Sequence, residues 1–185
     1  MSRYAGPLRQ IGIVTRDANA AMKYWAEVMG VGPFFVRPEL EFEEYRYYGR
    51  PSRAPIIKCA LGHSAGLQVE IIQQLNDAPS AYLDFLNSGR EGLQHMSSWF
   101  DDGADFDRTY DDLKARGFEI ALEGRMTAFD LRYAYFVPKT HSGQTPLLEI
   151  SDSLKVKEVR AMFDELERLN KEWDGSNPIR EFALS

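Results

Sequence analysis

The two halves of this 185-residue chain repeat the same order of predicted elements. Each half begins with an apolar strand, continues with a capped helix that ends at a glycine, and closes with further strands. The two helix-ending glycines, Gly30 and Gly117, lie 87 residues apart, and Glu70 and Glu149 of the two closing strands lie 79 residues apart. A repeat of this length, with one helix and about four strands in each unit, indicates a duplicated βαβββ module rather than a solenoid.

Apolar periodicity, capping residues and turn residues predict where the elements lie. The predicted strands cover residues 8–15, 34–36, 42–48, 55–61 and 67–72 of the first half, and 93–100, 118–122, 131–137 and 146–151 of the second. The predicted helices cover residues 18–29, 81–87, 105–116 and 155–173, and the tail 174–185 is rich in turn residues. Pro38 is expected to interrupt the strand that precedes it.

These elements predict an α+β fold in which two tandem βαβββ modules form one curved mixed sheet with a concave face. We expect the first module over residues 7–75, a connector with a short helix over 76–91, and the second module over 92–152. A C-terminal helix and tail follow over 153–185. The predicted C-terminal helix is amphipathic, with apolar residues at three- and four-residue steps.

One polar side chain interrupts the first and the last apolar strand of each module. These residues are Gln10, Glu70, His95 and Glu149. Because strand side chains alternate between faces, each points away from the face of its apolar neighbours, toward the predicted concave face. Burial of even a neutral polar group without a partner costs roughly 2–7 kcal/mol, so converging carboxylates require compensation.

A divalent cation would supply that compensation. Carboxylate, carboxamide and imidazole ligands suit Zn, Mn, Co, Ni or Fe(II), and they leave positions open for water or substrate. The sequence therefore predicts one divalent metal ion per site on the concave face. The alternative is that the four side chains are solvated strand positions, since antiparallel sheets commonly expose one face. Their equivalent places in the two repeats favour the metal site.

The opening segment 8–14, Asp17 and the helix end at 25–30 resemble the start of the vicinal oxygen chelate superfamily. This superfamily includes glyoxalase I, methylmalonyl-CoA epimerase, extradiol dioxygenases and the bleomycin and fosfomycin resistance proteins. Segments 92–96 and 147–150 resemble its second module, and the likeness covers about residues 7–152. The resemblance implies the same fold, a metal-binding site and, as in many members, a homodimer.

The resemblance also implies a ligand set, made of Gln10, Glu70, His95 and Glu149. This order is similar to that of zinc-using glyoxalase I. It differs from the epimerases, in which His usually stands first and Gln second. It differs also from the extradiol dioxygenases, which bind Fe(II) through two His and one Glu.

Glyoxalase I and the epimerases remove a proton next to a carbonyl, and the resemblance implies this chemistry here. A metal ion lowers the free energy of the enediolate, and a carboxylate removes and returns the proton. The expected protein is thus a lyase or isomerase acting on a small catabolic intermediate, with Glu149 as the first candidate base and Glu70 as its partner. A glutamate within 41–44 is a candidate second base. The alternatives are an acyl-CoA epimerase, an extradiol-type dioxygenase and a non-catalytic protein that binds a small molecule or drug.

Aromatic residues of the predicted strands are candidates for the substrate cavity, although such residues more often belong to the core. The candidates are Phe35, Tyr45, Tyr48, Trp99 and Tyr135. His63 and His141 stand beside glycine or serine and are expected to be loop or surface histidines.

Composition excludes several other classes of function. The chain carries 22 Lys and Arg against 28 Asp and Glu, a net charge of −6, with no basic block to bind nucleic acid or an anionic membrane. No apolar run has the length of a signal peptide or a membrane span. The single cysteine, Cys59, cannot form an intrachain disulfide and is expected to be a core thiol, which fits a cytoplasmic protein whose partner is a small-molecule substrate.

Overall fold

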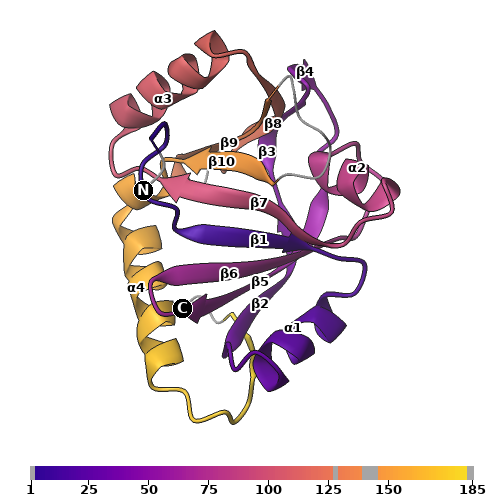
Figure 1. The fold of residues 1–185 in the computed structure, drawn as a ribbon, viewed down its shortest axis with the longest axis vertical. Coiled ribbons are helices and arrows are strands. Elements are labelled where there is room, and N and C mark those ends of the chain that lie inside the picture. Colours follow the sequence, from indigo (N-terminus) through magenta and orange to yellow (C-terminus); the bar gives the residue numbers. More distant parts are fainter. Residues whose placement is uncertain (1–2, 127–128, 139–145, 183–185) are drawn as a thin grey trace.

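The computed structural model describes residues 3–126, 129–138 and 146–182 (Figure 1). The strands are β1 (Gln10–Val14), β2 (Phe34–Glu41), β3 (Glu43–Tyr47), β4 (Arg50–Pro51), β5 (Ile56–Ser64), β6 (Leu67–Gln74), β7 (Gly92–Trp99), β8 (Phe118–Met126), β9 (Leu131–Pro138), β10 (Leu147–Ser151) and β11 (Ile179–Glu181). The helices are α1 (Ala18–Glu27), α2 (Ala81–Asn87), α3 (Gly103–Ala115) and α4 (Lys157–Lys171), and a 3₁₀ turn covers Ser153–Lys155.

All described strands belong to one mixed sheet of 11 strands, in the order β11-β2-β5-β6-β1-β7-β10-β9-β8-β3-β4. β1 lies in the middle, parallel to β6 and antiparallel to β7, and β10 is parallel to β7. The first strands of the two halves are therefore neighbours, and each pairs on its other side with the closing strand of its own half. The predicted α+β fold with a curved mixed sheet is confirmed.

The sheet is strongly curved because its two ends are joined by a very short connection. β2 and β3 are separated in sequence only by Phe42, yet they lie next to opposite edges of the strand order. β3 pairs with β8, so a strand of the first half completes the sheet of the second half. This exchange was not expected from the sequence, in which 42–48 stands among the strands of the first module.

Helices α1 and α3 both have capped N-termini, α1 at the predicted Asp17 and α3 at Asp102, because α3 begins at Gly103 rather than at the predicted residue 105. Asp17 accepts a hydrogen bond from the amide of Ala20 at 3.0 Å, and Asp102 accepts one from Ala104 at 2.8 Å. Gly30 and Gly117 follow the two helices with φ of +66° and +85°, a backbone conformation that favours glycine.

The alternation of side chains along the strands separates two faces. On the convex face, Met22 of α1 packs with Ile13 and Ile71, and Phe106 of α3 packs with Phe136. On the concave face, a third cluster joins Val14 and Ile72, the strand neighbours of Ile13 and Ile71, to side chains of α2 and α4. Helices α1 and α3 thus cover the outside of the curved sheet, whereas α2 and α4 lie against its inside.

Several local predictions were wrong. Pro38 lies within β2, where the pairing with β5 shifts between Arg37 and Leu40, so a bulge accommodates the residue that cannot donate a backbone hydrogen bond. β8 continues to Met126 instead of ending at 122. His63 is neither in a loop nor on the surface: it lies within β5 and only 4% of it is exposed.

The C-terminal tail, His141 and the length of the helices remain to be described. The turn-rich tail forms β11, in which Ile179 pairs with Phe34 at the edge of the sheet. His141 lies outside the described residues. None of the described helices has both the length and the apolar character that crossing a membrane requires.

Candidate active site

Three of the four predicted ligands meet inside the concave face. The Nε2 atom of His95 lies 3.2 Å from Oε2 of Glu70 and 3.5 Å from Oε2 of Glu149. Strand register explains the meeting: both His95 on β7 and Glu70 on β6 are aligned with Gly12 of β1, and β10 places Glu149 beside Ser97 of β7. The three side chains belong to one chain, so the cluster forms without a second subunit.

Gly12 provides the space that the His95 ring occupies. A Cβ atom at position 12 would lie 1.8 Å from Cε1 of His95, a distance that no pair of non-bonded atoms tolerates. The imidazole therefore lies across β1, between the two carboxylates. Only glycine at position 12 is compatible with this arrangement.

The orientation of the His95 ring is set by Gln94, a residue that sequence reasoning missed. The strand pairing of β1 with β7 shifts at this point, so Gln94 is the extra residue of a bulge. Its amide nitrogen donates to the carbonyl of Ala81 at 3.2 Å, and its oxygen lies 2.7 Å from Nδ1 of His95. Because that oxygen can only accept, Nδ1 carries a proton and Nε2 is the atom presented to the carboxylates. Metal-ligating histidines commonly have such a second hydrogen bond.

The two carboxylates differ in their surroundings. Burial raises the pKa of the Glu149 carboxyl to about 7; His95 opposes this rise and the charge of Glu70 adds to it. The buried Oε2 atom of Glu149 has no hydrogen-bond partner among the described residues. On Glu70, the other oxygen accepts a hydrogen bond from the Cys59 thiol at 3.3 Å. Burial raises the pKa of that thiol, which therefore keeps its proton, and the expected core position of Cys59 is confirmed.

Gln10, the fourth predicted ligand, lies on the same face but is turned to a different partner. Its amide nitrogen donates to Oε1 of Gln68 at 2.7 Å, and the amide nitrogen of Gln68 lies 3.3 Å from Nε2 of His63. All three side chains are buried. The amide oxygen of Gln10 takes part in neither of these two hydrogen bonds. The signal that could have found Gln68 is its position two residues before Glu70, on the same strand face.

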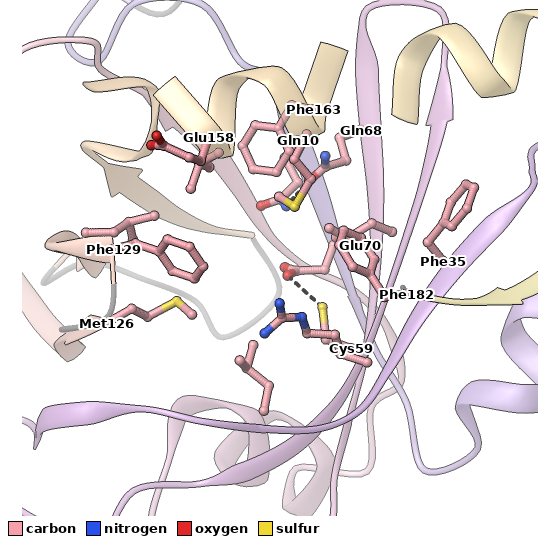
Figure 2. Close-up of a pocket in the computed structure, with 16 residues that line it drawn as sticks. Gln10, Phe35, Cys59, Gln68, Glu70, Met126, Phe129, Glu158, Phe163 and Phe182 are labelled. Atoms are coloured by element: carbon pink, nitrogen blue, oxygen red, sulfur yellow. Dashed lines mark hydrogen bonds between the residues drawn. The ribbon is translucent and has the colours of Figure 1, made fainter. Parts of the chain in front are cut away.

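A cavity of about 180 Å³ lies beside the cluster (Figure 2). Of the four predicted ligands, Gln10 and Glu70 line it, whereas His95 and Glu149 are not among its lining residues. Its walls are mostly apolar and come from the sheet, from α4 and from the C-terminal segment. The apolar side chains are Phe35, Leu40, Leu61, Met126, Phe129, Leu131, Val159, Met162, Phe163 and Phe182.

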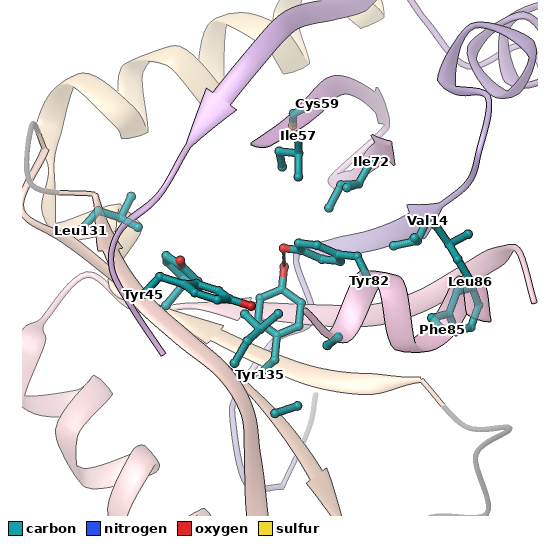
Figure 3. Close-up of a cluster of buried hydrophobic side chains, with 14 of the residues drawn as sticks. Val14, Tyr45, Ile57, Cys59, Ile72, Tyr82, Phe85, Leu86, Leu131 and Tyr135 are labelled. Atoms are coloured by element: carbon teal, nitrogen blue, oxygen red, sulfur yellow. Dashed lines mark hydrogen bonds between the residues drawn. The ribbon is translucent and has the colours of Figure 1, made fainter. Parts of the chain in front are cut away.

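The five aromatic candidates are distributed over four environments. Phe35 lines the cavity, and Trp99 reaches its wall indirectly, because its ring stacks on Phe163 at 4.5 Å between centroids. Tyr135 belongs to the cluster: its hydroxyl lies 3.4 Å from Nε2 of His95, and the Tyr82 hydroxyl of α2 donates to it at 3.1 Å (Figure 3).

The other two candidates do not line the cavity. Tyr45 is buried in the concave-face core, where its hydroxyl donates to the carbonyl of Pro79 at 3.0 Å. Tyr48 is 48% exposed at the end of β3 and packs edge-on against Tyr47.

Two of the glutamates proposed as a second base, Glu43 and Glu44, point away from the cluster. Glu43 and Glu44 are exposed on β3, and Glu44 lies 3.9 Å from Arg125. The side chain of Glu41 lies outside the described part of the chain.

The donor chemistry of the cluster fits a divalent cation. One imidazole nitrogen faces two carboxylate oxygens, and one of these, on Glu149, is buried without a hydrogen-bond partner. Across residues 3–126, 129–138 and 146–182, no three His, Cys, Asp or Glu side chains already have the spacing of metal ligands. Instead of surrounding a common point, the carboxylate oxygens of Glu70 and Glu149 contact Nε2 of His95 directly.

Residues 9–136 match the family model described as "Glyoxalase/Bleomycin resistance protein/Dioxygenase superfamily". Among curated proteins, no sequence matches the chain. The fold is similar to that of methylmalonyl-CoA epimerase from Mycobacterium tuberculosis, with a TM-score of 0.56 and 18% identity over 82% of this chain and 91% of that one.

Two further solved structures have a similar fold. A hypothetical protein from Bacillus halodurans has a TM-score of 0.53 and 16% identity, over 79% of this chain and 93% of that one. A variant of 4-hydroxymandelate synthase from Streptomyces coelicolor has a TM-score of 0.50 and 13% identity, over 78% of this chain and 47% of that one. At these identities the likeness establishes the fold alone.

Proposed function

The chain belongs to the glyoxalase/bleomycin resistance protein/dioxygenase superfamily, and on that premise we propose that it is a divalent-metal-dependent lyase or isomerase of glyoxalase I-like type. It would remove a proton next to the carbonyl of a small substrate. The observation that carries this proposal is the convergence of the Glu70 and Glu149 carboxylates on Nε2 of His95, beside an apolar cavity.

In this proposal the metal is held by the His95 nitrogen and by oxygens of Glu70, Glu149 and Gln10. The donor set suits Zn, Ni, Co, Mn or Fe(II). When bound, a divalent cation lowers the free energy of negative charge that develops on a substrate oxygen. Gln94 keeps the His95 ring in the orientation that presents Nε2.

The position of the cavity favours Glu70 as the proton-transferring group. A base must come within hydrogen-bond reach of the proton it removes, and Glu70 is one of the residues that line the cavity, whereas Glu149 is not. Glu70 would take the proton from the carbon next to the carbonyl, hold it on a carboxylate oxygen and return it to the product. The Cys59 thiol, which donates to Oε1, holds the carboxylate in place. The sequence had favoured Glu149 for this role.

The apolar walls give this chemistry a dry environment. Met162 and Phe163 of α4 face the cavity together with Leu61 of β5. Removing water from the site strengthens electrostatic interactions with the developing negative charge. We therefore assign to α4 the role of a wall that keeps solvent away from Glu70.

The test is to measure metal content and proton exchange in the same preparations. Inductively coupled plasma mass spectrometry of tag-free protein should detect about one divalent ion per chain, which His95→Ala should lose. His63→Gln, a change at a buried histidine outside the cluster, is the matched control and should retain the metal. Absence of metal from the wild type after reconstitution would contradict the proposal.

Proton exchange tests the reaction itself. Small carbonyl compounds, and methylmalonyl-CoA because of the epimerase likeness, are incubated in D₂O and followed by NMR. Catalysed exchange of the hydrogen next to the carbonyl supports a lyase or isomerase. Metal binding without any exchange would instead favour a dioxygenase, tested by oxygen uptake with Fe(II), or a binding protein.

A non-catalytic binding protein is the second candidate, and the apolar cavity wall favours it. Such a wall binds a small molecule through burial of apolar surface, without any chemistry. Binding that persists in His95→Ala, together with absence of turnover, would identify this function.

Two expectations from the sequence also remain proposals. We propose a homodimer and a cytoplasmic protein; the support for the second is that the one cysteine, Cys59, is a buried thiol. Light scattering coupled to size-exclusion chromatography tests the dimer.

A further inference from the structure

The cavity beside Glu70 is lined by one guanidinium group, for which the described residues provide no ion-pair partner. Arg37 of β2 lines the cavity, and its guanidinium carbon lies 5.4 Å from the centroid of the Phe182 ring. Among the described residues, no carboxylate lies within ion-pair distance of Arg37, and its side chain makes no hydrogen bond. Leaving a charged group beside apolar surface without a partner is unfavourable unless a ligand supplies the partner.

Other arginines of the chain show how the fold usually treats this group. Arg132 contacts Asp107 at 2.6 Å and Asp152 at 2.8 Å, and Arg116 contacts Asp112 at 2.7 Å. These arginines are on the convex side of the sheet or on helix surfaces. Arg37, in contrast, lies on the concave side, in a cavity whose lining is mostly aromatic and aliphatic and includes the carboxylates of Glu70 and Glu158.

Strand register places Arg37 close to the proposed reaction centre. Arg37 is the cross-strand partner of Cys59, so the two side chains lie on the same face of neighbouring strands. The Cys59 thiol in turn donates to Glu70 at 3.3 Å. The carboxylate of Glu70 and the guanidinium of Arg37 therefore line the same cavity, and Cys59 contacts the first and pairs across the strands with the second.

We propose that the substrate of this cavity has an apolar or aromatic body and a carboxylate, and that the carboxylate pairs with the guanidinium of Arg37. This inference rests on the proposed function for the placement of the reacting carbonyl, which would face Glu70. A planar guanidinium can donate two parallel hydrogen bonds to a carboxylate, and such pairs are stronger than neutral ones. Phe35 and Phe182, whose rings meet edge-on at 6.2 Å, provide aromatic wall for the substrate body.

The experiment compares three probes by isothermal titration calorimetry on the full chain. Phenylacetate has both the ring and the carboxylate, 2-phenylethanol lacks the charge, and acetate lacks the ring. The wild type should bind phenylacetate most tightly. Arg37→Gln should weaken phenylacetate binding by about tenfold or more, because charge-assisted hydrogen bonds are lost, and should leave 2-phenylethanol unaffected.

Arg50→Gln is the matched control, because Arg50 is exposed on β4 and its loss changes the net charge equally. It should bind all probes as the wild type does. Arg37→Lys keeps the charge without the planar fork and should give an intermediate affinity, which keeps the test meaningful if Arg37→Gln folds poorly. Circular dichroism establishes that each variant is folded.

Each titration is made on protein as purified and after treatment with a chelator, so that the metal and Arg37 are separated. Retained phenylacetate binding after chelation, with loss in Arg37→Gln, supports the inference whether or not the protein is a metalloenzyme. Absence of phenylacetate binding at millimolar concentration, or equal binding by wild type and Arg37→Gln, overturns it. Loss of phenylacetate binding on chelation alone would assign the carboxylate to the metal and overturn it as well, while leaving the proposed function intact.

Discussion

Glu70 and Glu149 occupy equivalent positions in the two halves, yet the surroundings of the two side chains differ. Each stands in the closing strand of its half, between apolar neighbours, and each points to Nε2 of His95. Glu70 lines the cavity, whereas Glu149 is not among its lining residues and has a pKa raised to about 7 by burial. Duplication of a strand therefore duplicates the position of a carboxylate but not its place in the lining of the cavity.

The opening strands differ in the same way. His95 in the second half is the centre of the cluster, whereas Gln10 in the first half is turned to Gln68. Gly12, two residues after Gln10, leaves room for the His95 ring, while Ser97 stands at the equivalent place in the other half. Helix α2, whose Tyr82 contacts Tyr135, covers the second-half side, and α4 bounds the cavity on the first-half side. The cavity itself is lined by residues of both halves, among them Leu61 of β5 and Leu131 of β9.

The largest effect should come from exchanging the two glutamates for glutamine, one at a time. If Glu70 transfers the proton, Glu70→Gln should lower the rate of carbonyl-adjacent proton exchange by about 10²–10⁴-fold. Glu149→Gln should lower it by a smaller factor. NMR exchange rates in D₂O measure both, and Glu119→Gln, at an exposed position of β8 away from the cavity, is the control. The reverse order of the two effects would assign the base to Glu149, as the sequence suggested.

The second effect concerns the space that Gly12 leaves for His95. Gly12→Ala should lower the free energy of unfolding by about 3 kcal/mol, because the new methyl group overlaps the imidazole and the ring must move. Urea denaturation measures the change. Gly66→Ala introduces the same methyl group where no atom lies within 4 Å and should change stability little. Equal effects of the two substitutions would show that the ring is not confined by β1.

The third effect concerns the three hydrogen-bonded side chains of the first half, Gln10, Gln68 and His63. The second half has no equivalent set, because Leu147 stands in place of Gln68. Burial lowers the pKa of His63 to about 4 from 6.5, so the unfolded chain binds a proton that the folded chain does not in this range. Stability should therefore fall as the pH decreases from 6.5 to 4, by about 3 kcal/mol from this group.

His63→Gln removes this titration and should flatten the pH dependence between pH 6.5 and 4. Urea denaturation over this range measures the difference between wild type and variant, which should be constant above pH 7. A parallel decrease in both proteins would assign the acid sensitivity to other groups.

The smallest effect concerns helix α4, which forms part of the cavity wall. Phe163→Ala should lower stability by about 1–2 kcal/mol, because it removes a partly buried ring that stacks on Trp99. Tryptophan fluorescence should shift to longer wavelength as Trp99 becomes hydrated. Asp164→Ala, an exposed change on the same helix, should alter neither quantity. An unchanged spectrum in Phe163→Ala would mean that α4 does not shield this part of the cavity.

Much of the fold could be predicted because it depends on local patterns. Asp17 and Gly30 mark the first helix, Gly117 marks the end of the third, and α2 has the predicted bounds of Ala81 and Asn87. His63 was misassigned because its neighbours, Gly62 and Ser64, are typical of a turn, whereas pairing with Gln68 across β6 keeps the strand intact. Local composition describes the backbone preference of a segment but not the strand that pairs with it.

Residue order alone was sufficient for the repeat, the alternation that directs Gln10, Glu70, His95 and Glu149 to one face, and the chemistry of their donor atoms. Tertiary structure decided which of them meet: the register of β1 with its neighbours brings Glu70 to His95, and Gly12 leaves room for the ring. It also decided that β3 joins β8 and that Arg37 faces a cavity. The physical reason is that side-chain direction follows from position in a strand, whereas contact depends on pairing between segments far apart in the chain.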